Sequence, residues 1–133
     1  MNLEKVVAVS GLPGLYKLVT PRNNGLIIED FDTGKKRFIS IRQHVFTPLA
    51  SVSIFTEDEP EELNTIFAAM EAKAGELDAD AALENNQDLA EYFGEILPSY
   101  DRDRVHIGDM KKVVKWYLFL RDHQLLHGGD EEE

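Results

Sequence analysis

The sequence predicts an α+β fold: a small SH3-like open β-barrel or meander over residues 1–57, followed by a three-helix unit over residues 58–127. Up to Thr56, short runs of Val, Ile, Leu, Phe and Tyr are punctuated by glycine, as in strands joined by tight turns. From Glu57 onward, apolar residues recur at helical spacing. The charge changes at the same point, from seven Lys/Arg against four Asp/Glu to seven against 21. Together these changes indicate two structural units.

The first half of the chain carries the turn signals of an antiparallel meander. The apolar spacing from Leu3 to Val7 predicts a short helical turn at the N-terminus. Pro13-Gly14 is typical of a type II turn, and Asn24-Gly25 is a strong hairpin signal. Asp32-Thr33-Gly34-Lys35 predicts the next hairpin, with Gly34 in the left-handed position. We expect strands over residues 15–20, 26–31, 36–41 and 51–55.

The second half predicts three helices. The acidic run Glu57 to Glu62 surrounds Pro60, and proline at a first helical position loses no hydrogen bond, so a helix should begin here and end at Gly75. Asn86 is the expected cap of the second helix and Asp109 that of the third. Residues 76–84, rich in Ala and acids, predict a loop or a weak helix. Residues 128–133 combine two glycines with like charges and predict a disordered acidic tail.

Composition excludes several classes of function. The chain has 133 residues and no cysteine, which rules out disulfides, thiolate metal sites and thiol nucleophiles. Its start is too short and polar for a secretory signal, and no apolar run approaches the length of a membrane span, so we expect a cytoplasmic protein without a membrane partner. A net charge of −11 disfavours general nucleic acid binding and favours basic partners. No cofactor is expected.

Two short glycine motifs match known sites only partly. Asp32-Thr33-Gly34 has the three-residue signature of aspartic proteases, but three cations follow it and would keep the aspartate ionised, which opposes proton sharing. Gly11-Leu12-Pro13-Gly14 lacks the pattern of a phosphate-binding loop, and a strand is expected after it rather than a helix. Both motifs are therefore interpreted as turns.

Two candidate metal sites are also weak. His123 and His127 lie four residues apart beside Asp122, at the frayed end of the expected third helix. Histidine near a helix C-terminus is favoured by the helix dipole without any metal. Asp101 and Asp103 begin like a calcium loop, but Val105 and His106 stand where a ligand and a glycine are required. We expect no metal at either place.

Two basic groups form the candidate interaction surface. Lys35, Lys36, Arg37 and Arg42 surround Phe38 in the strand-rich half. A solvated hairpin, a nucleic acid site and a contact with the protein's own acidic helices are all compatible with this cluster. In the third helix, Lys111, Lys112 and Lys115 accompany Trp116, whose large ring is suited either to the core or to an interface anchor.

Four segments resemble a family of small acidic bacterial proteins classed as a domain of unknown function. They run from Val9 to Leu18, from Asp32 to Phe38, from Ile54 to Glu59 and from Asp109 to Tyr117. The resemblance covers both halves of the chain. It implies a strand-rich N-terminal part and a helical C-terminal part, and it brings no activity, cofactor or catalytic residue with it.

The leading functional hypothesis is a non-enzymatic cytoplasmic binding or adaptor protein that engages another protein. It is motivated by the lack of any convergent set of nucleophile, base and oxyanion donors in the sequence. The alternative is a nucleic-acid or ribosome-associated protein that uses the basic residues from Lys35 to Arg42. A small hydrolase or metal enzyme is a third hypothesis. The oligomeric state and the identity of the partner are not predicted.

Overall fold

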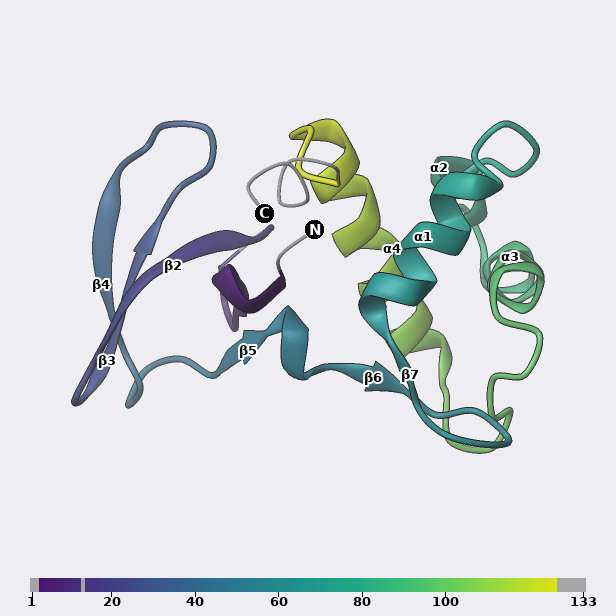
Figure 1. Cartoon of the computed structure of the whole chain (residues 1–133), viewed down its shortest axis with the longest axis horizontal. Helices are drawn as coiled ribbons and strands as arrows, with labels where there is room; N and C mark the ends of the chain where they lie inside the picture. Colours follow the sequence, from purple (N-terminus) through teal and green to yellow (C-terminus); the bar gives the residue numbers. More distant parts are fainter. Residues whose placement is uncertain (1–2, 13, 127–133) are drawn as a thin grey trace. The chain divides into compact units, whose positions relative to one another are not determined.

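The computed structural model describes residues 3–12 and 14–126 (Figure 1). These residues form two compact units. The first, here called the sheet unit, comprises the described residues up to Val52 together with residues 123–126. The second, the helical unit, runs from Ser53 to Asp122. The prediction of an α+β fold is therefore confirmed. The predicted acidic tail, residues 128–133, lies outside the described residues.

The sheet unit is built around one open antiparallel sheet of five strands, in the order β4-β3-β2-β1-β5. Figure 1 shows β2, β3 and β4 running side by side as a meander. The sheet is not closed, because β4 and β5 are its two edges, and a likeness to SH3-type barrels stays a prediction. The elements are η1 (Leu3–Lys5), β1 (Val6–Val9), β2 (Tyr16–Arg22), β3 (Gly25–Glu29), β4 (Lys36–Ser40), β5 (Phe46–Pro48) and η2 (Leu49–Ser51).

Local turn chemistry explains the hairpins. Gly34 has a φ of 74°, in the left-handed region that glycine occupies without steric cost, and it closes the turn between β3 and β4. Gly14, with a φ of 73°, precedes β2 in the same way, while Pro13 lies outside the described residues. Gly25 is already the first residue of β3 and pairs with Arg22. The β2–β3 turn therefore lies one residue earlier than predicted.

The prediction of a helical turn from Leu3 to Val7 is wrong beyond Lys5. Residues from Val6 onward form β1, which pairs with β2 on one side and β5 on the other. Valine is β-branched and favours strands, and the side chains of Val7 and Val9 enter the core of the sheet unit. Strand β5 lies between the last two predicted strands, at residues for which no strand was predicted. The buried members of this core are Val7, Val9, Tyr16, Ile28 and Ile39.

The helical unit contains four α-helices, so the three-helix prediction is corrected. The additional one is α2, a four-residue helix in the acidic segment, which the sequence left open between loop and weak helix. The side chain of Asp78 caps it by accepting a hydrogen bond from the backbone N–H of Ala81, at 3.1 Å. The elements are β6 (Ser53–Ile54), β7 (Glu61–Glu62), α1 (Leu63–Ala72), α2 (Ala79–Ala82), α3 (Asn86–Ile96) and α4 (Ile107–Asp122).

The predicted helix starts are displaced by a few residues. Helix α1 begins at Leu63, and not at Pro60, because β7 pairs with β6 just before it. Helix α3 is capped by Asn85, whose side chain accepts from the backbone N–H of Asp88, at 2.8 Å. Asp109 lies in the first turn of α4, where its carboxylate accepts from the N–H of His106. The sequence thus predicted correctly that polar side chains cap the starts of α3 and α4, but it did not identify the position of each cap exactly.

The helical unit buries the predicted apolar stripes. Phe93 is fully buried and meets the ring of Tyr100 edge-on, with centroids 5.3 Å apart. Phe67 lies against Tyr117 with a centroid distance of 6.3 Å.

Across residues 3–12 and 14–126, none of the helices combines the length and the apolar character needed to cross a membrane.

Candidate functional site

The outer face of the sheet, opposite the core of the sheet unit, combines apolar and basic side chains. Successive side chains of a strand point to opposite faces, and Tyr16, Ile28 and Ile39 lie in the core. The residues next to them, which are paired across β2, β3 and β4, therefore share the outer face. These residues, here called the outer sheet patch, are Lys17, Ile27, Glu29, Lys36 and Phe38.

Phe38 is held in place although it is 46% exposed. Its ring lies over Gly25, where an added β-carbon would overlap the carbonyl oxygen of Ile39 and come within 2.7 Å of the Phe38 ring. Glycine thus makes room for the aromatic ring on the outer face. The ring is a pre-positioned aromatic surface beside Lys36, which lies two residues earlier on the same face of β4.

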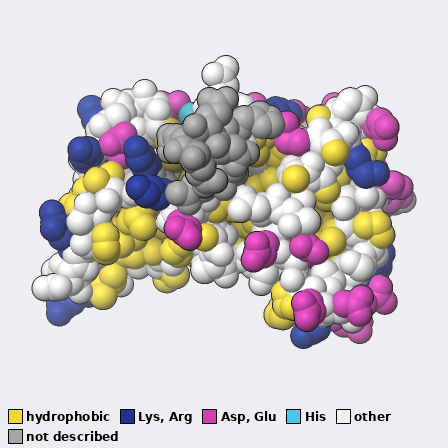
Figure 2. Space-filling model, in the orientation of Figure 1, with side chains coloured by type: hydrophobic (Ala, Val, Ile, Leu, Met, Phe, Trp, Pro, Cys, Tyr) yellow, Lys and Arg dark blue, Asp and Glu magenta, His cyan; other side chains and the backbone are white. Residues whose placement is uncertain are grey.

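Exposed apolar side chains concentrate in the sheet unit. Figure 2 shows apolar side chains gathered over the part formed by β2, β3 and β4, with Lys and Arg around them. In the helical unit the exposed Phe55 is covered by the guanidinium of Arg104, 4.3 Å from the ring centroid. Exposed aromatic and apolar groups beside cations are typical of partner-binding surfaces. Among the described residues of the sheet unit, the exposed large hydrophobic side chains are Val19, Phe38, Ile41 and Val45, at 37%, 46%, 56% and 69%.

The four predicted basic residues of the sheet unit do not form a single cluster. Lys36 lies on the outer face, whereas Arg37 pairs with Ile28 and lies on the opposite face. Lys35 belongs to the β3–β4 turn, where its N–H donates to the hydroxyl of Thr33. Arg42 follows the far end of β4. Only Lys36 therefore joins Phe38 in the outer sheet patch.

Helix α4 presents its lysines to solvent. Lys111, Lys112 and Lys115 are exposed, and Trp116 is half-buried rather than part of the core. Lys112 and Trp116 are four residues apart, so they lie side by side on the helix. Arg121 of α4 contacts the acidic segment of residues 76–84 instead, with 3.1 Å between its Nη2 and Oδ2 of Asp80.

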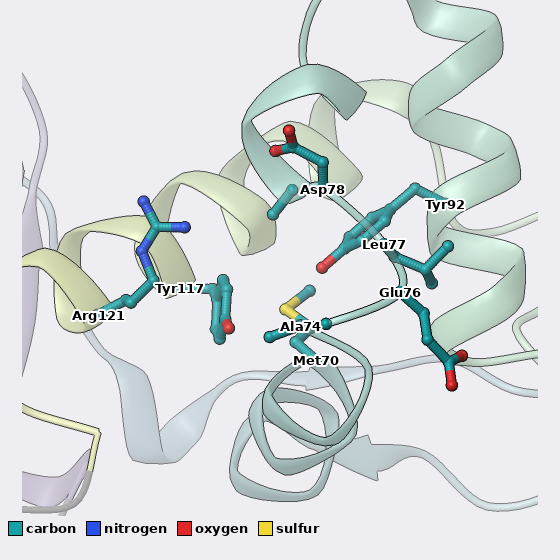
Figure 3. A pocket seen from close by; sticks show the side chains of 10 residues that line it. Met70, Ala74, Glu76, Leu77, Asp78, Tyr92, Tyr117 and Arg121 are labelled. Carbon is teal, nitrogen blue, oxygen red and sulfur yellow. The ribbon is translucent and has the colours of Figure 1, made fainter.

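A pocket of about 230 Å³ opens in the helical unit. Helix α1 and the segment after it provide Met70 and residues 74–79, α3 provides Tyr92, and α4 provides Tyr117 and Arg121 (Figure 3). Tyr92 and Tyr117 are 6% and 2% exposed. The Tyr117 hydroxyl donates a hydrogen bond to the Glu71 carboxylate, at 3.0 Å. The pocket thus has a tyrosine pair in its wall.

The electrostatics of the pocket keep both phenols protonated. Burial raises the pKa of Tyr92 to about 12, although nearby Arg121 acts in the opposite direction. Burial, followed by the hydrogen bond to Glu71, raises the pKa of Tyr117 well above its usual value. The hydrogen bond to Asp122 raises the pKa of Arg121, so this side chain stays a cation. At neutral pH the pocket offers O–H and N–H donors.

Two family models match the chain. The family described as Domain of unknown function (DUF6852) matches residues 52–120, and the one described as Domain of unknown function (DUF5606) matches residues 3–49. The chain belongs to the DUF6852 family. The DUF6852 match falls on the helical unit and the DUF5606 match on the sheet unit.

A solved structure supports this membership. A solution NMR structure from Bacteroides vulgatus, a target of the Northeast Structural Genomics Consortium, is 32% identical to this chain, with a TM-score of 0.73. The match covers 93% of this chain and 89% of that one. No curated protein matches. The resemblance to an uncharacterised bacterial family, strand-rich first and helical second, is confirmed.

The rejected motifs have structural roles. The Asp30 carboxylate accepts hydrogen bonds from the N–H groups of Asp32 and Thr33, which lowers its pKa and makes Asp32-Thr33-Gly34 part of a turn. His123 contacts Asp32, with 2.9 Å between Nε2 and Oδ1, while His127 lies outside the described residues. Within the described part of the chain, no group of three His, Asp or Glu side chains is arranged to hold a metal.

The calcium-like motif that begins at Asp101 is also a turn. The Asp101 carboxylate accepts from the backbone N–H groups of Asp103 and Arg104, and from the Arg104 side chain at 2.9 Å. Sequence reasoning missed the pocket, because Tyr92 and Tyr117 look like ordinary members of apolar helix stripes. The signal that was available is their phenolic oxygen, which a buried tyrosine must place beside a partner or in an opening.

Proposed function

We propose that this protein is a non-enzymatic cytoplasmic binding or adaptor protein that engages an acidic segment of another protein through the outer sheet patch. The observation that carries the proposal is the exposed ring of Phe38, held over Gly25 beside Lys36. An aromatic anchor with a cation next to it suits a partner that offers an apolar side chain and carboxylates.

Charge supports an acidic partner for this half of the molecule. The first 56 residues carry seven Lys/Arg against four Asp/Glu, although the whole chain has a net charge of −11. Lys17 and Lys36 flank Glu29 in one row across β2, β3 and β4. Because opposite potentials steer association, an acidic segment approaches the sheet unit more readily than the acidic helical unit.

Reversing the charge of Lys36 should weaken partner capture about tenfold, since the acidic segment would meet a like charge. Tagged wild-type protein and Lys36→Glu are used to capture partners from native lysate, and the recovered partner is quantified. Arg37→Glu is the matched control: it makes the same charge change at the next residue of β4, on the opposite face. Equal losses in the two variants, or no stoichiometric partner for the wild type, would contradict the proposal.

Nucleic acid or ribosome association is the second candidate. It is favoured by the exposed ring of Phe38 beside Lys17 and Lys36, since aromatic rings with flanking cations stack single-stranded bases. Binding of a labelled single-stranded RNA, followed by fluorescence anisotropy, should then weaken steeply with salt and be lost in Phe38→Ser. A flat titration at low salt would remove this candidate.

A further inference from the structure

The pocket of the helical unit is lined by Tyr92, a buried side chain whose hydroxyl reaches the opening. Tyr92 is only 6% exposed, and its hydroxyl makes no hydrogen bond to any described residue. In Figure 3 this hydroxyl points into the space between Tyr117, Arg121 and Met70. Among the described residues no fully buried side-chain nitrogen or oxygen lacks a hydrogen-bond partner, so this hydroxyl is open to the pocket and is a donor available to a ligand or water.

A second donor lines the same pocket. Arg121 uses Nε and Nη2 for Asp122 and Asp80, and its Nη1 makes no hydrogen bond to a described residue. Tyr117 is different, because its O–H is already directed to Glu71. The groups that remain available are therefore donors, and they suit a ligand that presents an oxygen acceptor.

The charges around the pocket disfavour a charged ligand. Asp80 and Asp122 already balance Arg121, so an anion would meet a net negative surrounding. The carboxylate of Asp78 caps α2, and that of Glu76 points away from the Tyr92 hydroxyl in Figure 3. A cation would meet the guanidinium of Arg121 in the wall, while the Asp78 carboxylate, which also lines the pocket, is already engaged by the N–H of Ala81.

The apolar part of the wall sets the size and shape of the ligand. Met70, Ala74 and Leu77 lie beside the rings of Tyr92 and Tyr117 (Figure 3). A volume of about 230 Å³ exceeds the roughly 150 Å³ of a cavity that holds benzene. A single ring with a small polar substituent fits this space.

We propose that this pocket binds a small uncharged ring compound that bears a carbonyl or carboxamide oxygen, and that the Tyr92 hydroxyl donates a hydrogen bond to this oxygen. The site lies wholly in the helical unit, so it is independent of the outer sheet patch. The raised pKa of Tyr92 supports the role, because the phenol remains a donor throughout the neutral range.

Three probes of equal shape and different charge test the proposal: benzamide, benzoate and benzylamine. Each is titrated into isotope-labelled full-length protein, and the backbone amide peaks of residues 74–79 are followed by NMR. For a probe of this size we expect benzamide to bind with a Kd of about 1 mM. Benzoate and benzylamine should bind at least about tenfold more weakly because of their charge.

Tyr92→Phe removes only the hydroxyl and should weaken benzamide binding about fivefold. Tyr100→Phe is the matched control, because Tyr100 is a buried tyrosine of the same unit that does not line the pocket. It should leave the benzamide Kd unchanged. The comparison of the three probes uses the wild-type protein alone, so its result does not depend on whether Tyr92→Phe folds.

Three results would overturn the proposal. The first is an absence of saturable shifts at residues 74–79 with benzamide up to about 20 mM, some twenty times the expected Kd. The second is a charged probe that binds as tightly as benzamide. The third is an unchanged benzamide Kd in a folded Tyr92→Phe variant.

Discussion

Gly25→Ala should destabilise the sheet unit by about 3 kcal/mol or more, one of the largest effects of a single methyl group in this protein. The added β-carbon would overlap the carbonyl oxygen of Ile39, which is backbone and cannot rotate away. It would also displace the ring of Phe38. Because Gly25 pairs with both Arg22 and Ser40, the β2–β3–β4 ladder must open to relieve the overlap.

A urea titration followed by NMR measures this effect unit by unit. The amide peaks of Ile28 and Ile39 report on the sheet core, and the indole of Trp116 reports on the helical unit. Gly108→Ala is the control: a β-carbon there meets open space at the start of α4, and alanine in a helix should stabilise by about 0.5 to 1 kcal/mol. A Gly25→Ala variant as stable as wild type would show that Phe38 is not held over Gly25.

Features of the fold that depend on local chemistry were predictable from the sequence. The turn that contains Gly34 and the caps of the last two helices require only residues a few positions apart, and each was predicted to within about three residues. Strand β1 was not predictable in this way. Val6 and Val7 fit a helical period equally well, and their strand conformation is decided by pairing with β2 and β5.

The predicted start of α1 was wrong for a related reason. Pro60 and its acidic neighbours satisfy the local rule for a helix N-terminus. The pairing of Glu61 and Glu62 with β6 keeps this stretch extended, and the helix begins only at Leu63. Contacts with a segment several residues away in the chain therefore outweighed the local preference.

The candidate sites show the same contrast between features that follow from local sequence and features that depend on contacts between distant segments. The association of Lys36 with Phe38 follows from the two-residue period of a strand, and that period also separates Lys36 from Arg37, which a simple count of charges had grouped together. The pocket requires α3 and α4 to bring Tyr92 to Tyr117 and Arg121. The four-residue spacing of Tyr117 and Arg121 places these two side by side on α4, but nothing in the chain indicates that Tyr92 joins them.

The tyrosine pair should make the helical unit sensitive to alkali. A folded-state pKa above the unfolded value means that the stabilisation is complete below pH 10 and is lost as the pH rises toward the folded pKa. Burial raises the pKa of Tyr92 from its ordinary value of 10.0 to about 12 in the folded state. The free energy of unfolding should therefore fall by about 2 kcal/mol between pH 10 and pH 12 from Tyr92 alone.

Urea unfolding followed by Trp116 fluorescence between pH 8 and pH 12 tests this expectation. In Tyr92→Phe the decrease in the free energy of unfolding should be smaller by about 2 kcal/mol, because a phenyl ring has no proton to lose. At neutral pH the same variant should be nearly as stable as wild type, since the Tyr92 hydroxyl makes no hydrogen bond to a described residue. Tyr100→Phe leaves the pocket tyrosines in place and should retain the full wild-type fall. If Tyr92→Phe and wild type lose stability in parallel up to pH 12, the Tyr92 phenol is not shielded from water, and its hydroxyl does not lie in a pocket wall.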